Sequence, residues 1–63
     1  MLIKTPKIKV GTFVVVPDPK GDDIWTHSFQ ARVIKIDTDN DEAFIEDGDG
    51  DVYCVELKRL IVI

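Results

Sequence analysis

The chain has 63 residues, of which 44% are hydrophobic and 32% are charged, with twelve acids against eight bases and a net charge of −4. This length fits one domain spanning residues 1–63, and its thin core leaves little room for an enclosed substrate pocket of roughly 300–1,000 Å³, so we expect no enzymatic activity. The acidic balance argues against broad binding to phosphate backbones, which depends on Lys and Arg.

Cysteine content and apolar patterning indicate a location and exclude several kinds of site. The only cysteine, Cys54, rules out an internal disulfide and a site of several thiolates. A small domain without disulfides suits a reducing compartment, and no apolar run reaches the length of a signal peptide or a membrane span. We therefore expect a cytoplasmic chain with no membrane partner and no cofactor. The apolar neighbours of Cys54 predict a buried thiol.

The composition predicts strands, since Val and Ile number sixteen while Ala, Leu and Met together number six. Residues 1–9 read as an extended lead-in. The first strand is expected over Thr12–Pro17, and its continuous apolar run predicts burial on both faces. The loop Pro17–Asp23 follows, rich in turn-forming residues.

The longest predicted strand, Ser28–Ile36, has an irregular pattern. Apolar residues alternate from Phe29 to Val33, and the alternation then moves to the other parity at Ile34. A change of parity within one strand is typical of a β-bulge or a sharp bend.

The rest of the chain reads as short strands and tight turns. In chain order we expect a turn over Asp37–Glu42, a strand over Ala43–Glu46, a glycine-containing hairpin turn, a strand over Asp51–Val55, a single 3₁₀ turn within Glu56–Arg59 and a strand over Leu60–Ile63. Together these elements predict an all-β fold, a small five-stranded antiparallel barrel.

The order of these residues resembles a Tudor-like small β-barrel, one form of the Src-homology-type barrel. The resemblance rests on Trp25 ahead of a strand with Ala31-x-Val33, and on the acidic glycine turn that follows Ala43–Glu46. It implies an aromatic cage that binds a methylated Lys or Arg side chain through cation–π attraction. Trp25 would be one wall, and Phe29 or Phe44 another. Asp47-Gly48-Asp49 stands where the family has an aromatic residue in this turn, so the cage would be incomplete.

Eight of the twelve acids fall between Asp37 and Asp51. Asp37, Asp39 and Asp41 have the spacing that begins an EF-hand calcium loop, but the required glycine and terminal glutamate are missing, and a second register starting at Asp47 also fails. We interpret both acidic segments as solvated turns and expect no metal, with a weak divalent-cation site at Asp37, Asp39 and Asp41 as the alternative.

Trp25 and His27 allow more than one interpretation. An exposed Trp25 would mark a contact surface, because tryptophan is enriched at binding hot spots, whereas a buried Trp25 would cap the open end of a barrel. His27 has no nucleophile in a suitable position, since the side chain of the adjacent Ser28 points to the opposite face of a strand. A catalytic role is therefore not expected.

The lead hypothesis is a non-catalytic interaction module, an adaptor that binds a protein or a basic peptide through an aromatic rim and acidic hairpin loops. Its predicted contact residues are Trp25, Phe29, Phe44, Asp47, Asp49 and Tyr53. The alternative is a nucleic-acid-binding barrel using basic residues of the N-terminal half, namely Lys7, Lys9, Arg32 and Lys35. The apolar C-terminal run could also pair with a second chain, which would give a homodimer through edge strands.

Overall fold

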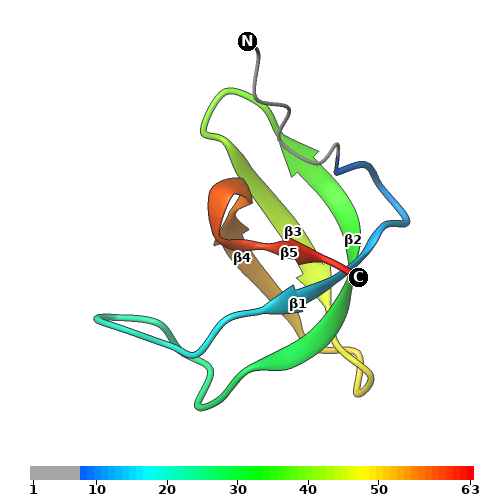
Figure 1. The fold of residues 1–63 in the computed structure, drawn as a ribbon. Helices are drawn as coiled ribbons and strands as arrows, with labels where there is room; N and C mark the ends of the chain where they lie inside the picture. The colour runs from blue at the N-terminus through cyan, green and yellow to red at the C-terminus, as the bar shows by residue number, and fades with distance from the viewer. Residues whose placement is uncertain (1–7) are drawn as a thin grey trace, which may run out of the picture.

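The computed structural model describes residues 8–63 and contains one antiparallel sheet of five strands and a single 3₁₀ turn (Figure 1). In chain order the elements are β1 (Phe13–Val16), β2 (Phe29–Asp37), β3 (Glu42–Glu46), β4 (Val52–Glu56), the 3₁₀ turn η1 (Leu57–Arg59) and β5 (Ile61–Val62). The predicted all-β class is confirmed, and each expected strand overlaps an observed one.

The strands are arranged in the order β4-β3-β2-β1-β5, and the long β2 curves so that the sheet wraps around its own core (Figure 1). In the described part of the chain no backbone pairing joins β4 to β5. The sheet is therefore open there, and closure into a barrel stays a prediction. The expected lead-in over 1–9 lies almost entirely outside the described residues. Within residues 8–63, no helix has the length and apolar character needed to cross a membrane.

The predicted irregularity in β2 is confirmed. Val33 pairs with Ile45, but the next pair along the ladder is Lys35 with Phe44, so Ile34 is the extra residue of a β-bulge. The bulge changes which side chains point inward, and Ile36 therefore packs against the core on the same side as Val33. This bend allows β2 to pair with β1 along its first part and with β3 along its second part.

The core consists of the side chains that alternate inward along the strands, together with Trp25 and Leu60. Its buried members are Val14, Val16, Trp25, Ala31, Val33, Ala43, Ile45, Val55 and Leu60. The expectation that β1 is buried on both faces is wrong. Phe13 is 61% exposed and Val15 is partly exposed, because nothing in the described chain covers the outer face of β1.

Both acidic turns use an aspartate to bind their own backbone. Asp37 Oδ1 accepts hydrogen bonds from the backbone N–H groups of Asp39 and Asn40, at 3.1 and 3.3 Å. Asp41 then adopts a left-handed conformation with φ of 54°, which completes the turn into β3. These contacts explain the choice of Asp and Asn by turn geometry, as the sequence predicts.

Comparing the same substitution at a buried position and at an exposed position tests which side chains form the core. Ile45 is 0% exposed on β3, so Ile45→Val leaves a small cavity and should lower the free energy of unfolding by about 0.5–1.5 kcal/mol in urea denaturation. The matched control, Ile61→Val on β5, removes the same methylene from a side chain that is 58% exposed, and should cost about 0.5 kcal/mol or less. Equal losses for the two variants would contradict this assignment of the core.

Candidate functional site

Trp25 closes one end of the core. Its side chain is only 8% exposed, and its indole Nε1–H donates a hydrogen bond to the backbone carbonyl of Pro17 at 2.9 Å. That bond satisfies the one polar group of a buried tryptophan. Of the two interpretations that the sequence allows, the structure therefore shows the cap, and Trp25 offers little of its surface to a partner.

Trp25 packs with two other aromatic residues, Phe29 at the start of β2 and Tyr53 on β4. Trp25 makes edge-to-face contacts with both, with centroid distances of 6.3 Å to Phe29 and 6.1 Å to Tyr53, and the Phe29 and Tyr53 centroids are 5.2 Å apart. Such contacts typically add about 0.5–1.5 kcal/mol each beyond area burial. The three rings touch one another, so they form a packed cluster with one accessible side.

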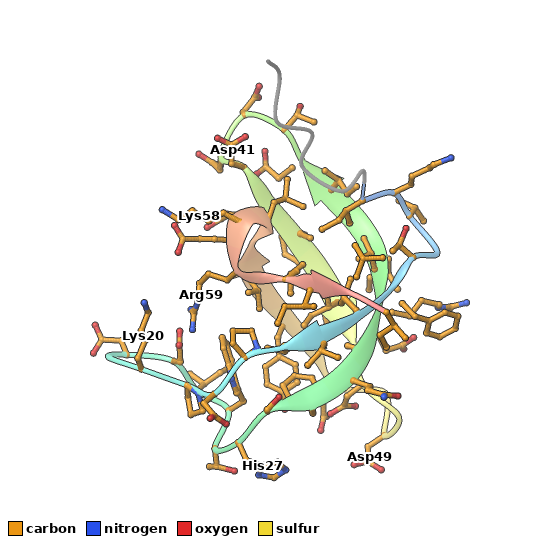
Figure 2. All side chains as sticks on the ribbon, viewed as in Figure 1. Lys20, His27, Asp41, Asp49, Lys58 and Arg59 are labelled. Carbon is orange, nitrogen blue, oxygen red and sulfur yellow. The ribbon has the colours of Figure 1, made fainter. Side chains whose placement is uncertain are left out.

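The guanidinium of Arg59, a cation of the chain itself, lies over the Trp25 ring. The Arg59 guanidinium on η1 is 5.4 Å from the centroid of the indole ring, within cation–π range. The same guanidinium binds Asp23 in a bidentate manner, with Nη1–Oδ1 and Nη2–Oδ2 distances of 3.2 and 2.8 Å. Figure 2 shows Arg59 projecting from η1 towards the loop before β2. This contact ties that loop to the C-terminal part of the chain.

The Asp23–Arg59 pair makes stability dependent on pH. The hydrogen bond from Arg59, followed by the bond to the backbone of Lys20, holds the pKa of Asp23 below its ordinary value of 3.8. A carboxylate with a lowered pKa stabilises the folded state above its ordinary pKa, and that contribution is lost as pH falls through the lowered one. The loop should therefore loosen only in acid.

A groove of about 420 Å³ lies beside the aromatic cluster, between the loop before β2 and the turn joining β3 to β4. We call it the acidic groove. It is lined by Ile24, Trp25, Thr26, His27, Phe29, Gln30, Asp47, Gly48, Asp49, Asp51 and Tyr53. Figure 2 shows His27 and Asp49 at the same end of the molecule, and Asp41 at the other end. The groove therefore combines three carboxylates with the accessible side of the aromatic cluster.

Of the three carboxylates of the acidic groove, one holds the turn together and two are free of side-chain hydrogen bonds within the described residues. Asp47 Oδ1 accepts the backbone N–H groups of Asp49 and Asp51, both at 2.9 Å, and so builds the turn. Gly50, with φ of 87°, provides the left-handed position that the turn needs. Asp49 and Asp51 are exposed, and no side-chain hydrogen bond of theirs is present among residues 8–63. Their carboxylates are therefore accessible to a ligand.

The hydroxyl of Tyr53 reports the electrostatic character of the acidic groove. Partial burial raises the pKa of Tyr53 above 10.0, and the charges of Asp47, Asp51 and Asp49 raise it further. A neighbouring negative charge disfavours the tyrosinate and, by the same field, favours a bound cation. The groove is thus an aromatic surface with negative potential.

The structure brings together five of the six predicted contact residues, because Trp25, Phe29, Asp47, Asp49 and Tyr53 all line the acidic groove. Phe44 is elsewhere: it lies on the outer face of the sheet, with Lys35 Nζ 5.5 Å from its ring centroid.

Sequence reasoning left six of the groove residues out of the predicted set, namely Ile24, Thr26, His27, Gln30, Gly48 and Asp51. Asp51 could have been found, since it lies two positions before Tyr53 in the same acidic turn. The placement of Ile24 and His27 depends on the path of the loop, which no periodicity reveals.

The predicted basic residues do not form one groove in the described chain. Lys7 lies outside the described residues, and Lys9 is exposed in the turn before β1. Arg32 and Lys35 share the outer face of the sheet, where Arg32 lies 3.8 Å from a carboxylate oxygen of Glu46 and Lys35 lies over Phe44. Each of these two charges has a partner within the chain.

The remaining candidate ligands are dispersed. Among residues 8–63, no group of three or more His, Cys, Asp or Glu side chains could hold a metal ion. Of the weak candidates Asp37, Asp39 and Asp41, Asp37 binds its own turn, including Asn40 Nδ2 at 2.9 Å. The prediction of a buried Cys54 is wrong, since this residue is exposed on the outer face of β4. Partial desolvation of its sulfur, and then Glu42, raise its pKa and disfavour the reactive thiolate.

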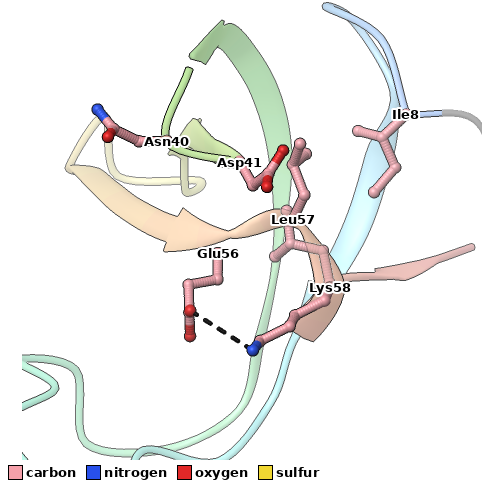
Figure 3. Close-up of a pocket in the computed structure, with 7 residues that line it drawn as sticks. Ile8, Asn40, Asp41, Glu56, Leu57 and Lys58 are labelled. Atoms are coloured by element: carbon pink, nitrogen blue, oxygen red, sulfur yellow. Dashed lines mark ion pairs between the residues drawn. The ribbon is translucent and has the colours of Figure 1, made fainter. Parts of the chain in front are cut away.

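A second hollow, of about 470 Å³, lies at the other end of the sheet (Figure 3). It is lined by Ile8, Asn40, Asp41, Glu56, Leu57, Lys58 and Leu60. Lys58 Nζ and Glu56 Oε2 form an ion pair across its rim at 3.8 Å, drawn as a dashed line in Figure 3. The charges of Lys58 and Glu56 therefore balance each other. None of the described lining residues is aromatic. The acidic groove is the stronger candidate.

The chain was compared with protein-family models, curated proteins and solved structures, and none of them matches it. The small five-stranded antiparallel fold is observed directly, while the Tudor-like resemblance remains a prediction from the sequence.

The negative potential of the acidic groove can be measured at Tyr53. Because this is the only tyrosine in the chain, ultraviolet titration reads its pKa directly. Asp49→Asn together with Asp51→Asn removes two of the charges that raise this pKa, so we expect it to fall towards 10.0. Neutralising Asp39 and Asp41 in the opposite turn is the matched control and should leave the pKa of Tyr53 unchanged. An equal response to both pairs would mean that only the net charge matters.

Proposed function

We propose that this chain is a non-catalytic interaction module that binds a basic peptide segment of a partner protein in the acidic groove. The observation that supports this function most directly is the convergence of Asp47, Asp49 and Asp51 on the accessible side of the Trp25–Phe29–Tyr53 cluster. Long basic side chains suit such a surface, because their apolar stems cover ring carbons while their charged ends reach carboxylates.

The shape of the groove supports an extended peptide rather than an enclosed small molecule. It is partly open to solvent, and its walls come from a loop and a tight turn. The groove could therefore hold one or two side chains of a peptide whose backbone continues across the surface. Contacts at exposed carboxylates are individually weak and are screened by salt. We accordingly expect modest affinity with a strong dependence on ionic strength.

The experiment is a titration of the ¹⁵N-labelled chain with a peptide of alternating Arg and Gly, followed by amide shifts. We expect the shifts to map to residues 24–30 and 47–53, and the affinity to fall as salt rises. Asp49→Asn with Asp51→Asn should weaken binding on the order of tenfold at low salt, because two surface ion pairs are removed.

The matched control is Asp39→Asn with Asp41→Asn, which makes the same change in net charge in the turn at the other end of the sheet. This control should bind the peptide as tightly as the parent chain. Loss of affinity in both double variants, or the absence of any peptide binding, would overturn the proposal. So would salt-dependent binding of a single-stranded oligonucleotide with shifts at Arg32 and Lys35, which is the outcome expected from the alternative function.

A further inference from the structure

The backbone at one edge of the sheet lacks partners. β4 pairs with β3 on one side, and no strand among residues 8–63 pairs with its other side. At one end of the β3–β4 ladder, the Asp47 N–H donates to the Asp51 carbonyl at 3.0 Å. At the other end, the Leu57 N–H donates to the Asp41 carbonyl at 2.8 Å. In an antiparallel ladder, successive residues alternately direct both backbone groups towards the partner strand and away from it, so these two bonds fix which residues of β4 face outward.

Val52, Cys54 and Glu56 direct their backbone groups outward from β4, and all three residues are exposed. Tyr53 and Val55 direct theirs to β3. No backbone hydrogen bond within residues 8–63 uses the three outward N–H groups or the carbonyls of Val52 and Cys54. The Glu56 carbonyl belongs to the start of η1. In the described chain, the edge therefore presents three unpaired donors and two unpaired acceptors to an incoming strand.

The other edge of the sheet is a poorer template for an added strand. β5 has two residues, and the Ile63 N–H donates to the Phe13 carbonyl at 3.2 Å, so only Val62 in this strand directs both backbone groups outward. Edge strands that are protected against pairing usually carry a lysine, a proline or a bulge, and β4 has none of these. Pairing of an extended segment with the described chain is therefore favoured at β4.

The side chains at the two ends of β4 favour a basic partner. Glu42 and Glu56 are direct cross-strand neighbours, and like charges at such positions repel each other. Lys58 Nζ lies 3.8 Å from Glu56 Oε2, so it balances only one of these two charges. At the other end of β4, Asp51 and Tyr53 line the acidic groove. A strand added here would pass carboxylates at both ends of β4.

Between these two ends the edge is apolar. Cys54 lies opposite Phe44 in the ladder, and both side chains are on the outer face of the sheet. Side chains two residues apart on an added antiparallel strand would lie beside Cys54 and Glu56. The edge thus fits an extended segment with an apolar residue beside Cys54, a basic residue two positions before it beside Glu56, and basic residues towards the acidic groove.

We propose that the basic peptide of the partner protein binds to β4 as an added antiparallel strand and reaches the acidic groove at the end where Asp51 and Tyr53 lie. This inference rests on the proposed function, because it assigns the backbone conformation and the residue pattern of the same partner. In such pairing, main-chain hydrogen bonds supply affinity and the side chains beside the strand supply selectivity. A second copy of the chain is a less suitable occupant, because its own β4 would bring further carboxylates, Asp51 and Glu56, to an acidic edge.

Amide hydrogen exchange in the ¹⁵N-labelled chain measures whether the edge is free and whether a peptide covers it. In the chain alone, the amides of Val52, Cys54 and Glu56 should exchange faster than those of Tyr53 and Val55, which donate to β3. The peptide Arg-Thr-Val-Arg-Val-Arg has the required pattern and should slow the three outward amides selectively. Slow exchange of these amides in the chain alone would overturn the proposal, because a second copy or another segment of the chain would already cover the edge.

Two N-methylated forms of this peptide separate strand pairing from charge attraction. When its first arginine lies beside Glu56, the two valines direct their N–H groups to β4, while the threonine and the second arginine direct theirs away. N-methylation of both valines should therefore weaken binding about tenfold, and N-methylation of the threonine and the second arginine about twofold or less. Equal affinities of the two forms would overturn strand pairing. If both forms bind equally and Asp49→Asn with Asp51→Asn weakens both, the proposed function stands without this inference, whereas the absence of any binding overturns both.

A change in the chain tests the same pairing without a modified peptide. Cys54→Pro removes an outward N–H that does not serve the ladder to β3, a position where an edge strand tolerates proline. It should weaken peptide binding about tenfold, whereas the matched control Cys54→Ala keeps the N–H and should bind like the parent chain. Circular dichroism checks that both variants fold, and the N-methylated peptides decide the matter if Cys54→Pro does not. Parent-like affinity of a folded Cys54→Pro variant, or equal losses in both variants, would contradict the added strand.

Discussion

The indole of Trp25 is the contact on which the arrangement of this small chain depends. It contacts four parts of the chain: the residue after β1 through the Pro17 carbonyl, the start of β2 through Phe29, β4 through Tyr53, and η1 through Arg59. A 63-residue chain has a thin core and a small free energy of unfolding. One large buried side chain whose polar atom is hydrogen-bonded therefore contributes a large share of that stability. The Arg59 guanidinium lies 5.4 Å from the indole centroid, and its bidentate pair with Asp23 ties the loop to η1.

This constraint also positions the proposed binding site. Because Trp25 fixes the loop before β2, residues 24–28 lie opposite the turn of Asp47, Asp49 and Asp51, and the acidic groove opens between them. The tryptophan itself is mostly buried, so the partner would contact the rims of Phe29 and Tyr53 and the exposed carboxylates. The net charge of the chain is thus concentrated at loops, while β1 and β5 contain no charged residue.

Sequence reasoning predicted the parts of the fold that depend on local patterns. Alternation located the strands, the parity change at Val33 and Ile34 located the bulge, and the aspartates and glycines located both turns. It failed where the outcome depends on distant segments. Phe13 and Cys54 are exposed because no other segment of the described chain covers them. An apolar run in the sequence does not show whether another segment will cover it. The Asp23–Arg59 pair joins residues 36 positions apart and left no signal in the sequence, and Phe44 was misplaced because both faces of β3 carry apolar side chains.

Hydrogen exchange of the indole N–H measures whether Trp25 is held in place by the contacts around it. Since the chain has one tryptophan, the ¹⁵N-labelled protein gives a single indole signal. We expect this proton to exchange far more slowly than that of free tryptophan at the same pH, because it is buried and donates to the Pro17 carbonyl. Arg59→Gln should speed its exchange by releasing Asp23 and uncovering the ring. Exchange at the rate of free tryptophan in the folded chain, or protection unaffected by Arg59→Gln, would contradict the account.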